Sequence, residues 1–116
     1  MNVHIYCFDK GLFINKKFVK KLKNELKNEF GELEKDEYVH LNMLLCKVDK
    51  DYNSYFNVYE QSCDLDRLIN ALTKVSNAYE LNLSCELNQE NERDILNYIR
   101  EQVKNKNITV SASMIV

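Results

Sequence analysis

The apolar residues of this chain change their spacing several times, from every second residue to every third or fourth and back again. A period of two predicts a strand with one buried face, and a period near 3.6 predicts a helix with one buried stripe. Alternation predicts strands over residues 2–8, 38–48, 55–61, 81–87 and 108–116. Helical spacing predicts helices over residues 15–30, 64–79 and 91–103. The chain is therefore predicted to be an α+β protein.

The order of these elements, β-α-β-β-α-β-α-β, indicates how they pack. Its first six elements follow the split β-α-β arrangement of ferredoxin-like folds, in which two helices cover one face of an antiparallel sheet. The clean alternation over residues 81–87 favours helices on one face only, because strands covered on both faces are continuously apolar. We expect a mostly antiparallel five-stranded sheet with a ferredoxin-like core, an added helix and strand, and helices on one face. A doubly wound parallel sheet is the alternative.

Length and composition predict one cytoplasmic domain over residues 1–116. A chain of 116 residues with 45% hydrophobic content can build one core, and two glycines with no proline leave no linker. No apolar run approaches the roughly 20 residues that cross a bilayer, and the first residues lack the basic start of a secretion signal. The four cysteines are irregularly spaced, so reduced thiols are expected.

The first predicted helix is the best marked and the only basic element. Asn15 can cap its first turn, and Gly31 stands where a left-handed C-cap is favoured. Residues 1–30 carry a net charge of +4, whereas residues 31–116 carry −6. Six lysines are expected on the solvent side and flanks of this helix: Lys16, Lys17, Lys20, Lys21, Lys23 and Lys27. A solvated lysine face is the simpler interpretation, and a nucleic-acid contact is the alternative.

No pattern in the sequence predicts a metal site, a cofactor site or a catalytic site. His4 and Cys7 have a zinc-like spacing, but positions three apart on a strand point to opposite faces. The chain contains no CxxC, GxGxxG, P-loop, GxSxG or HExxH motif. Cys63 precedes a helix, which can lower a thiol pKa, yet no basic partner for it is identifiable.

One constellation stands out, on the face of the sheet that we expect the helices to leave open. Alternation places two histidines and four tyrosines there: His4, Tyr6, Tyr38, His40, Tyr55 and Tyr59. Tyrosine and histidine combine large contact area with polar tips, so these residues are candidates for binding a partner. They are equally the ordinary occupants of a solvated sheet face. Glu86 is the one carboxylate that we can place beside them.

These features lead to a ranked set of hypotheses. The first is a small non-enzymatic protein-binding module, such as an inhibitor, an immunity-type protein or a regulatory subunit, whose acidic body can complement a basic partner. The alternative is a ferredoxin-like module that binds RNA through the lysine helix and the aromatic sheet face. A third is a small enzyme with His4 or His40 as acid or base. Self-association through an exposed edge strand is a further expectation.

Overall fold

The computed structural model describes residues 1–7, 15–33, 38–41, 44–47, 54–58 and 63–114. These residues form one compact α+β globule with a Cα radius of gyration of 13.3 Å. The helices are α1 (Asn15–Phe30), α2 (Cys63–Ser76) and α3 (Arg93–Gln102), and a 3₁₀ turn, η1 (Glu90–Glu92), precedes α3. The strands are β1 (Asn2–Cys7), β2 (Tyr38–Leu41), β3 (Leu44–Lys47), β4 (Tyr55–Val58), β5 (Leu81–Leu87) and β6 (Ile108–Met114).

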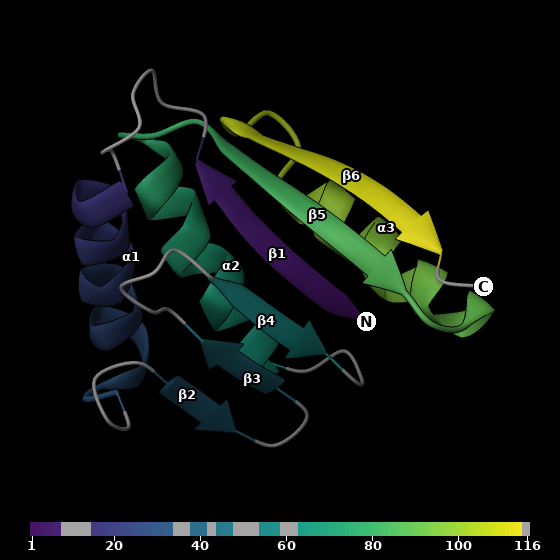
Figure 1. Cartoon of the computed structure of the whole chain (residues 1–116), viewed down its shortest axis with the longest axis horizontal. Coiled ribbons are helices and arrows are strands. Elements are labelled where there is room, and N and C mark those ends of the chain that lie inside the picture. Colours follow the sequence, from purple (N-terminus) through teal and green to yellow (C-terminus); the bar gives the residue numbers. More distant parts are fainter. Residues whose placement is uncertain (8–14, 34–37, 42–43, 48–53, 59–62, 115–116) are drawn as a thin grey trace.

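All six strands belong to one mixed sheet in the order β2-β3-β4-β1-β5-β6 (Figure 1). Every neighbouring pair is antiparallel except β5 and β6, which run parallel. β1 thus lies near the centre, between β4 and β5, while β2 and β6 form the two edges. The expectation of a mostly antiparallel sheet is confirmed.

The prediction of a single strand over residues 38–48 is wrong, and the described residues form a sheet of six strands rather than five. β2 and β3 pair antiparallel with Leu41 opposite Leu44, so the chain reverses direction between them. The alternation breaks here, since residues 43–46 are consecutively apolar, and a period of two carries no information about strand direction. Neither glycine nor proline marks the reversal in the sequence.

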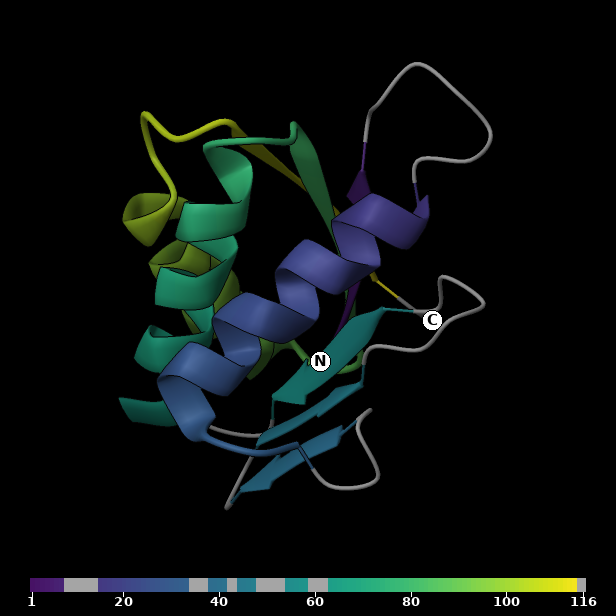
Figure 2. The ribbon, with the colours of Figure 1, turned by 90° about the vertical axis from the view of Figure 1, so that its left-hand side faces the viewer.

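The three α-helices all lie on one side of the sheet (Figure 2), as predicted. β1 shows why: Val3 and Ile5 are buried toward the helices, whereas His4 is half-buried and Tyr6 exposed on the other side. β5 alternates in the same way along its whole length. Among the described helices, none is long and apolar enough to span a membrane.

The C-terminal end of α1 has the predicted cap. Gly31 adopts φ +83°, a left-handed conformation that favours glycine, and its N–H donates to the Lys27 carbonyl over 2.8 Å. α2 ends at Ser76, three residues before the predicted limit at Tyr79. The Tyr79 ring still packs edge-on against Phe18 of α1, with ring centroids 5.9 Å apart.

Candidate functional site

The side of the sheet that carries no helix, here the helix-free face, is organised in rows set by strand register. Directly paired residues of neighbouring strands lie side by side on one face. One row runs from edge to edge of the sheet through six paired positions: Tyr38, Lys47, Tyr55, His4, Ser84 and Ser111. The central position of this row belongs to His4 on β1.

Two further rows flank the first. On one side the paired positions are His40, Leu45, Asn57, Asn2, Glu86 and Ser113. On the other side Tyr6 pairs with Asn82, which pairs with Thr109. Of the residues predicted for partner binding, His4, Tyr6 and Tyr55 therefore lie on the helix-free face. Tyr38 and His40 are paired in register with these rows, but their side chains, and Tyr59 as a whole, lie outside the described part of the structure.

His4 lies next to two tyrosines and one carboxylate on this face. Its ring lies nearly parallel to that of Tyr6, with centroids 6.3 Å apart, and 6.0 Å from the ring of Tyr55. Its Nε2 lies 3.5 Å from Oε1 of Glu86, on the neighbouring strand β5. Tyr6 is 52% exposed, and among the described residues it is the one large hydrophobic side chain that is exposed. We call His4, Tyr6, Tyr55 and Glu86 the His4 cluster.

The His4 cluster brings aromatic rings, an imidazole and a carboxylate together on one face. The sequence predicted that Glu86 lies on this face but not how far it lies from His4; in the structure its carboxylate stands beside the imidazole. A histidine beside a carboxylate is one component of general acid–base catalysis, which also needs a reacting group within hydrogen-bond reach of the imidazole. Within the described ranges, no group of three or more His, Cys, Asp or Glu side chains is arranged to hold a metal ion.

The lysines of α1 lie on the other side of the molecule, in the helix layer (Figure 2). Lys17 and Lys20 are exposed, whereas Lys23 and Lys27 are half-buried. Lys21 forms an i,i+4 ion pair with Glu25 at 3.1 Å. The side chain of Lys16 lies outside the described part of the structure. The sheet therefore separates the basic helix from the His4 cluster.

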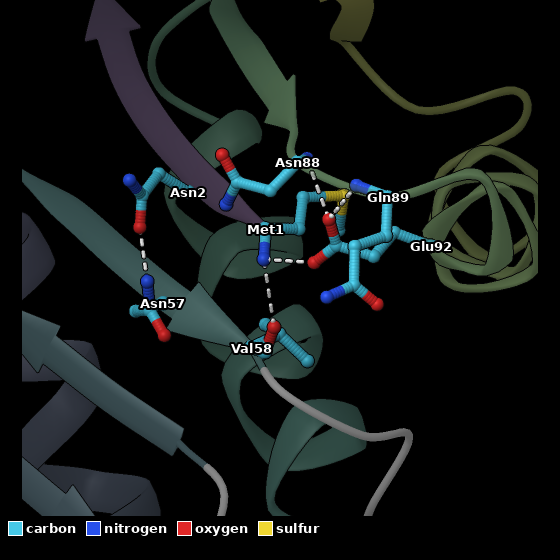
Figure 3. A network of polar contacts seen from close by, with 7 residues as sticks. All are labelled: Met1, Asn2, Asn57, Val58, Asn88, Gln89 and Glu92. Atoms are coloured by element: carbon cyan, nitrogen blue, oxygen red, sulfur yellow. Dashed lines mark hydrogen bonds and ion pairs between the residues drawn. The ribbon is translucent and has the colours of Figure 1, made fainter. Parts of the chain in front are cut away.

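A second polar network, which the sequence analysis missed, joins the start of β1 to η1 (Figure 3). The N-terminal ammonium of Met1 is buried, donates to the Val58 carbonyl over 3.1 Å, and forms an ion pair with Glu92. The other carboxylate oxygen of Glu92 accepts the N–H groups of Asn88 and Gln89 at 2.6 and 2.9 Å. Glu92 is 91 positions from Met1 in the chain, so only the fold brings the two groups together.

This network sets the pKa of Glu92. Partial burial acts to raise the pKa of the carboxyl, but the hydrogen bonds from the Met1 ammonium, Asn88 and Gln89 and the ammonium charge outweigh it. The pKa of Glu92 is therefore lowered from its ordinary value. Since every partner of the carboxylate belongs to the protein itself, the network stabilises the fold and is not a candidate binding site.

Comparison with known proteins gave no relative: no family model, no curated protein and no solved structure matches the chain. A function therefore has to be inferred from the chain's own residues and their geometry.

Proposed function

We propose that the chain is a non-enzymatic protein-binding module that covers a partner's functional surface with its helix-free face. An inhibitor, an immunity-type protein or a regulatory subunit acts in this way. The observation that carries the proposal is the His4 cluster, in which an exposed tyrosine packs beside a histidine at the centre of a face without helices. Aromatic side chains with polar tips are enriched where proteins bind one another.

The cluster is suited to binding because its residues are held in place before a partner arrives. His4 and Tyr6 stand on β1, which has strands on both sides and buries Val3 and Ile5 against the helices. A rigid strand limits the backbone freedom that binding would otherwise remove, and tyrosine has few rotatable bonds to immobilise. The contact between the His4 and Tyr6 rings restricts their side chains further.

The distribution of charge indicates what kind of partner fits. Among the residues of the three rows, Glu86 is the one that carries a carboxylate, so the helix-free face offers mainly aromatic and hydrogen-bonding groups. Other acidic side chains stand in η1 and in the first turns of α2 and α3: Asp64, Asp66, Glu90, Glu92 and Asp94. The net charge of −2 favours a basic partner at long range, but α2 and α3 lie on the helix side of the sheet, so a partner's contacts with the helix-free face would be largely uncharged.

We assign the core of the sheet to the ferredoxin-like arrangement as part of the same proposal. The support is the pairing order β3-β4-β1-β5, in which all neighbours are antiparallel. α2 joins β4 to β5, which are separated by the one inserted strand β1. α1 and the strand β2 after it connect β1 to β3, which are separated by the one inserted strand β4, so both connections fit the split β-α-β pattern. β2 would then be an addition at one edge, and α3 with β6 an addition at the other.

The alternative function, RNA binding, draws on the same aromatic rings, because bases can stack on exposed aromatics of a sheet. Its second element is the lysine-rich face of α1, which lies in the helix layer and not beside the His4 cluster. An RNA strand would have to pass around an edge of the sheet to contact both. We therefore rank protein binding first.

The proposal can be tested by affinity capture from the source organism with substituted baits. The wild-type chain is compared with Tyr6→Ser, which alters the His4 cluster, and with Lys20→Ser, a matched change of an exposed residue in the helix layer. We expect a protein that the wild type and Lys20→Ser retain and Tyr6→Ser loses. Calorimetry with that protein should give a Kd raised about tenfold or more by Tyr6→Ser, as expected for a central aromatic contact.

Two results would count against protein binding through this face. One is a partner whose affinity is the same for the wild type and for Tyr6→Ser. The other is capture of RNA alone, with binding that weakens steeply between low and high salt, since phosphate contacts behave in this way. Circular dichroism and thermal unfolding of each variant establish that the fold is retained.

A further inference from the structure

The free edge of β6 offers a second interaction surface, independent of the His4 cluster. β6 has one neighbour in the sheet, β5, and lies at its outer edge (Figure 1). The Leu81 N–H donates to the Asn107 carbonyl over 3.0 Å, and backbone groups alternate in direction along a strand. The N–H and C=O groups that face away from β5 therefore belong to four residues: Ile108, Val110, Ala112 and Met114.

This edge lacks the features that normally prevent a strand from pairing. Edge strands in natural proteins are usually short, or carry charged residues, proline or a bulge. β6 has seven residues, none of them charged and none proline. Its register with β5 continues without interruption from Ile108 to Met114, and none of its residues has a positive φ. A strand of this kind is a template for pairing with another strand.

The sequence of β6 is complementary to itself when two copies run antiparallel about Ser111. Apolar residues then lie opposite apolar residues, and hydroxyl residues opposite hydroxyl residues. The pairs in this register are Ile108 with Met114, Val110 with Ala112, Thr109 with Ser113, and Ser111 with Ser111. The residues with outward backbone groups also lie opposite one another, so the whole strand forms about eight hydrogen bonds between the copies.

We propose that the chain forms a two-fold symmetric dimer by antiparallel pairing of β6 with β6 of a second copy, centred on Ser111. Directly opposed residues of an antiparallel pair project to the same face, so both helix layers lie on one side of a continuous sheet. The half-buried Val110 and Met114 and the exposed Ala112 form the apolar row of β6. Pairing covers this row with the same row of the second copy.

A second copy fits this edge better than an unrelated strand because each position finds its match in the strand itself. The central pair contains two serines, which are small and uncharged, so the closest approach at the two-fold axis is unobstructed. Pairing of two edge strands buries less area than a standard protein interface, so we expect a weak dimer. Its dissociation constant should lie in the micromolar range, on the order of 10–100 µM.

Sedimentation equilibrium at chain concentrations from about 5 µM to 0.5 mM, a range that brackets this constant, measures the dimer. We expect Ser111→Lys and Ser111→Asp each to weaken self-association at least about tenfold, because like charges then lie opposite one another at the axis. Mixing the two variants should restore association, since opposite charges then meet. Ser111 is exposed, so these changes should leave the far-ultraviolet circular dichroism of the monomer unchanged.

Cysteine cross-linking tests the register. A centred, non-hydrogen-bonded antiparallel pair has Cα atoms about 4.5 Å apart, within the range of a disulfide. Ser111→Cys should therefore give a covalent dimer under mild oxidation. Ser113→Cys is the matched control, because two residues at that position lie far from each other across the axis. The wild type under the same conditions gives the background from the native cysteines.

Three results would overturn the proposal. The first is a wild-type chain that stays monomeric up to about 0.5 mM, well above the expected constant. The second is a dimer that Ser111→Lys and Ser111→Asp leave unchanged, and the third is cross-linking as efficient through Ser113→Cys as through Ser111→Cys. Neither the loss nor the presence of this dimer decides whether Tyr6 binds a partner protein, so the two proposals can fail separately.

Discussion

Replacement of Glu92 by glutamine should destabilise the protein strongly, although the change removes only a charge. The carboxylate pairs with the buried Met1 ammonium through one oxygen and accepts the N–H groups of Asn88 and Gln89 through the other. Glutamine can still accept the two N–H groups, but without charge, and its NH₂ group cannot accept from the ammonium. The ammonium then remains buried without a counter-charge.

The expected loss follows from these contacts. A hydrogen bond to a charged group contributes about 1.5–3 kcal/mol, and the two retained bonds weaken when their acceptor becomes neutral. The Glu92 side chain is only 12% exposed, so water replaces little of what is lost. We expect the free energy of unfolding at pH 7 to fall by about 3 kcal/mol, which corresponds to about 10 °C in Tm for a chain of this size.

The effect should depend on pH in a defined direction. The pKa of Glu92 is lowered in the folded protein, so the unfolded chain binds the proton at higher pH than the folded one. The stabilisation is complete above the unfolded pKa and is lost as the pH falls through the folded pKa. The difference between wild type and Glu92→Gln should therefore be largest above about pH 5 and shrink toward pH 3.

Urea unfolding followed by circular dichroism at pH 7 and pH 3 measures this difference, on a chain that begins with a free Met1 amine. Glu90→Gln is the matched control, because Glu90 lies in the same turn but is 74% exposed and pairs with Arg93 of the helix beside it, at 2.7 Å. It should change stability by no more than about 0.5 kcal/mol. Equal losses for the two variants, or a Glu92→Gln effect that is the same at both pH values, would refute the reasoning.

Two further predictions concern the backbone of α1 and the chemistry of β5. Gly31→Ala should lower the free energy of unfolding by about 1 kcal/mol. The cost comes from the backbone, because φ is +83° and an added Cβ would meet no atom within 4 Å. Urea titration measures the change, and unchanged stability would contradict the prediction. Burial raises the pKa of the fully buried Cys85 thiol to about 11. Iodoacetamide at pH 8 should therefore alkylate Cys85 only after unfolding. Rapid labelling of Cys85 in the native protein, detected by mass spectrometry, would contradict this.

Local patterns in the sequence were sufficient for the elements whose ends and faces are marked by single residues. α1 runs from Asn15 to Phe30, its stripe of Phe18, Leu22 and Leu26 is buried, and Gly31 ends it, as the spacing and the C-cap glycine predicted. β5 likewise buries every second residue. Such elements are predictable because their signals lie within a few residues of the structure they determine.

Contacts between distant segments could not be predicted in the same way. Alternation along residues 38–48 predicted one strand with Leu45 on the side opposite His40, but the reversal between β2 and β3 pairs Leu45 directly with His40. The candidate face was predicted residue by residue, yet the 3.5 Å approach of His4 to Glu86 depends on the register of β1 with β5. The ion pair of Met1 with Glu92 depends on the topology of the whole sheet, which no periodicity encodes.

The two proposed surfaces belong to the same sheet, and this has a consequence for how they would act together. Pairing of β6 would place the helix-free faces of two copies side by side, with β5 and β6 of each copy between the two β1 strands. With strands about 4.8 Å apart, the two His4 residues, which lie in the row of Ser111, would be about 24 Å from each other. A standard interface of about 800 Å² per partner extends over a similar distance, so one partner protein could contact both His4 clusters. Binding would then favour the dimer, and by linkage Ser111→Lys would weaken partner binding without altering either cluster.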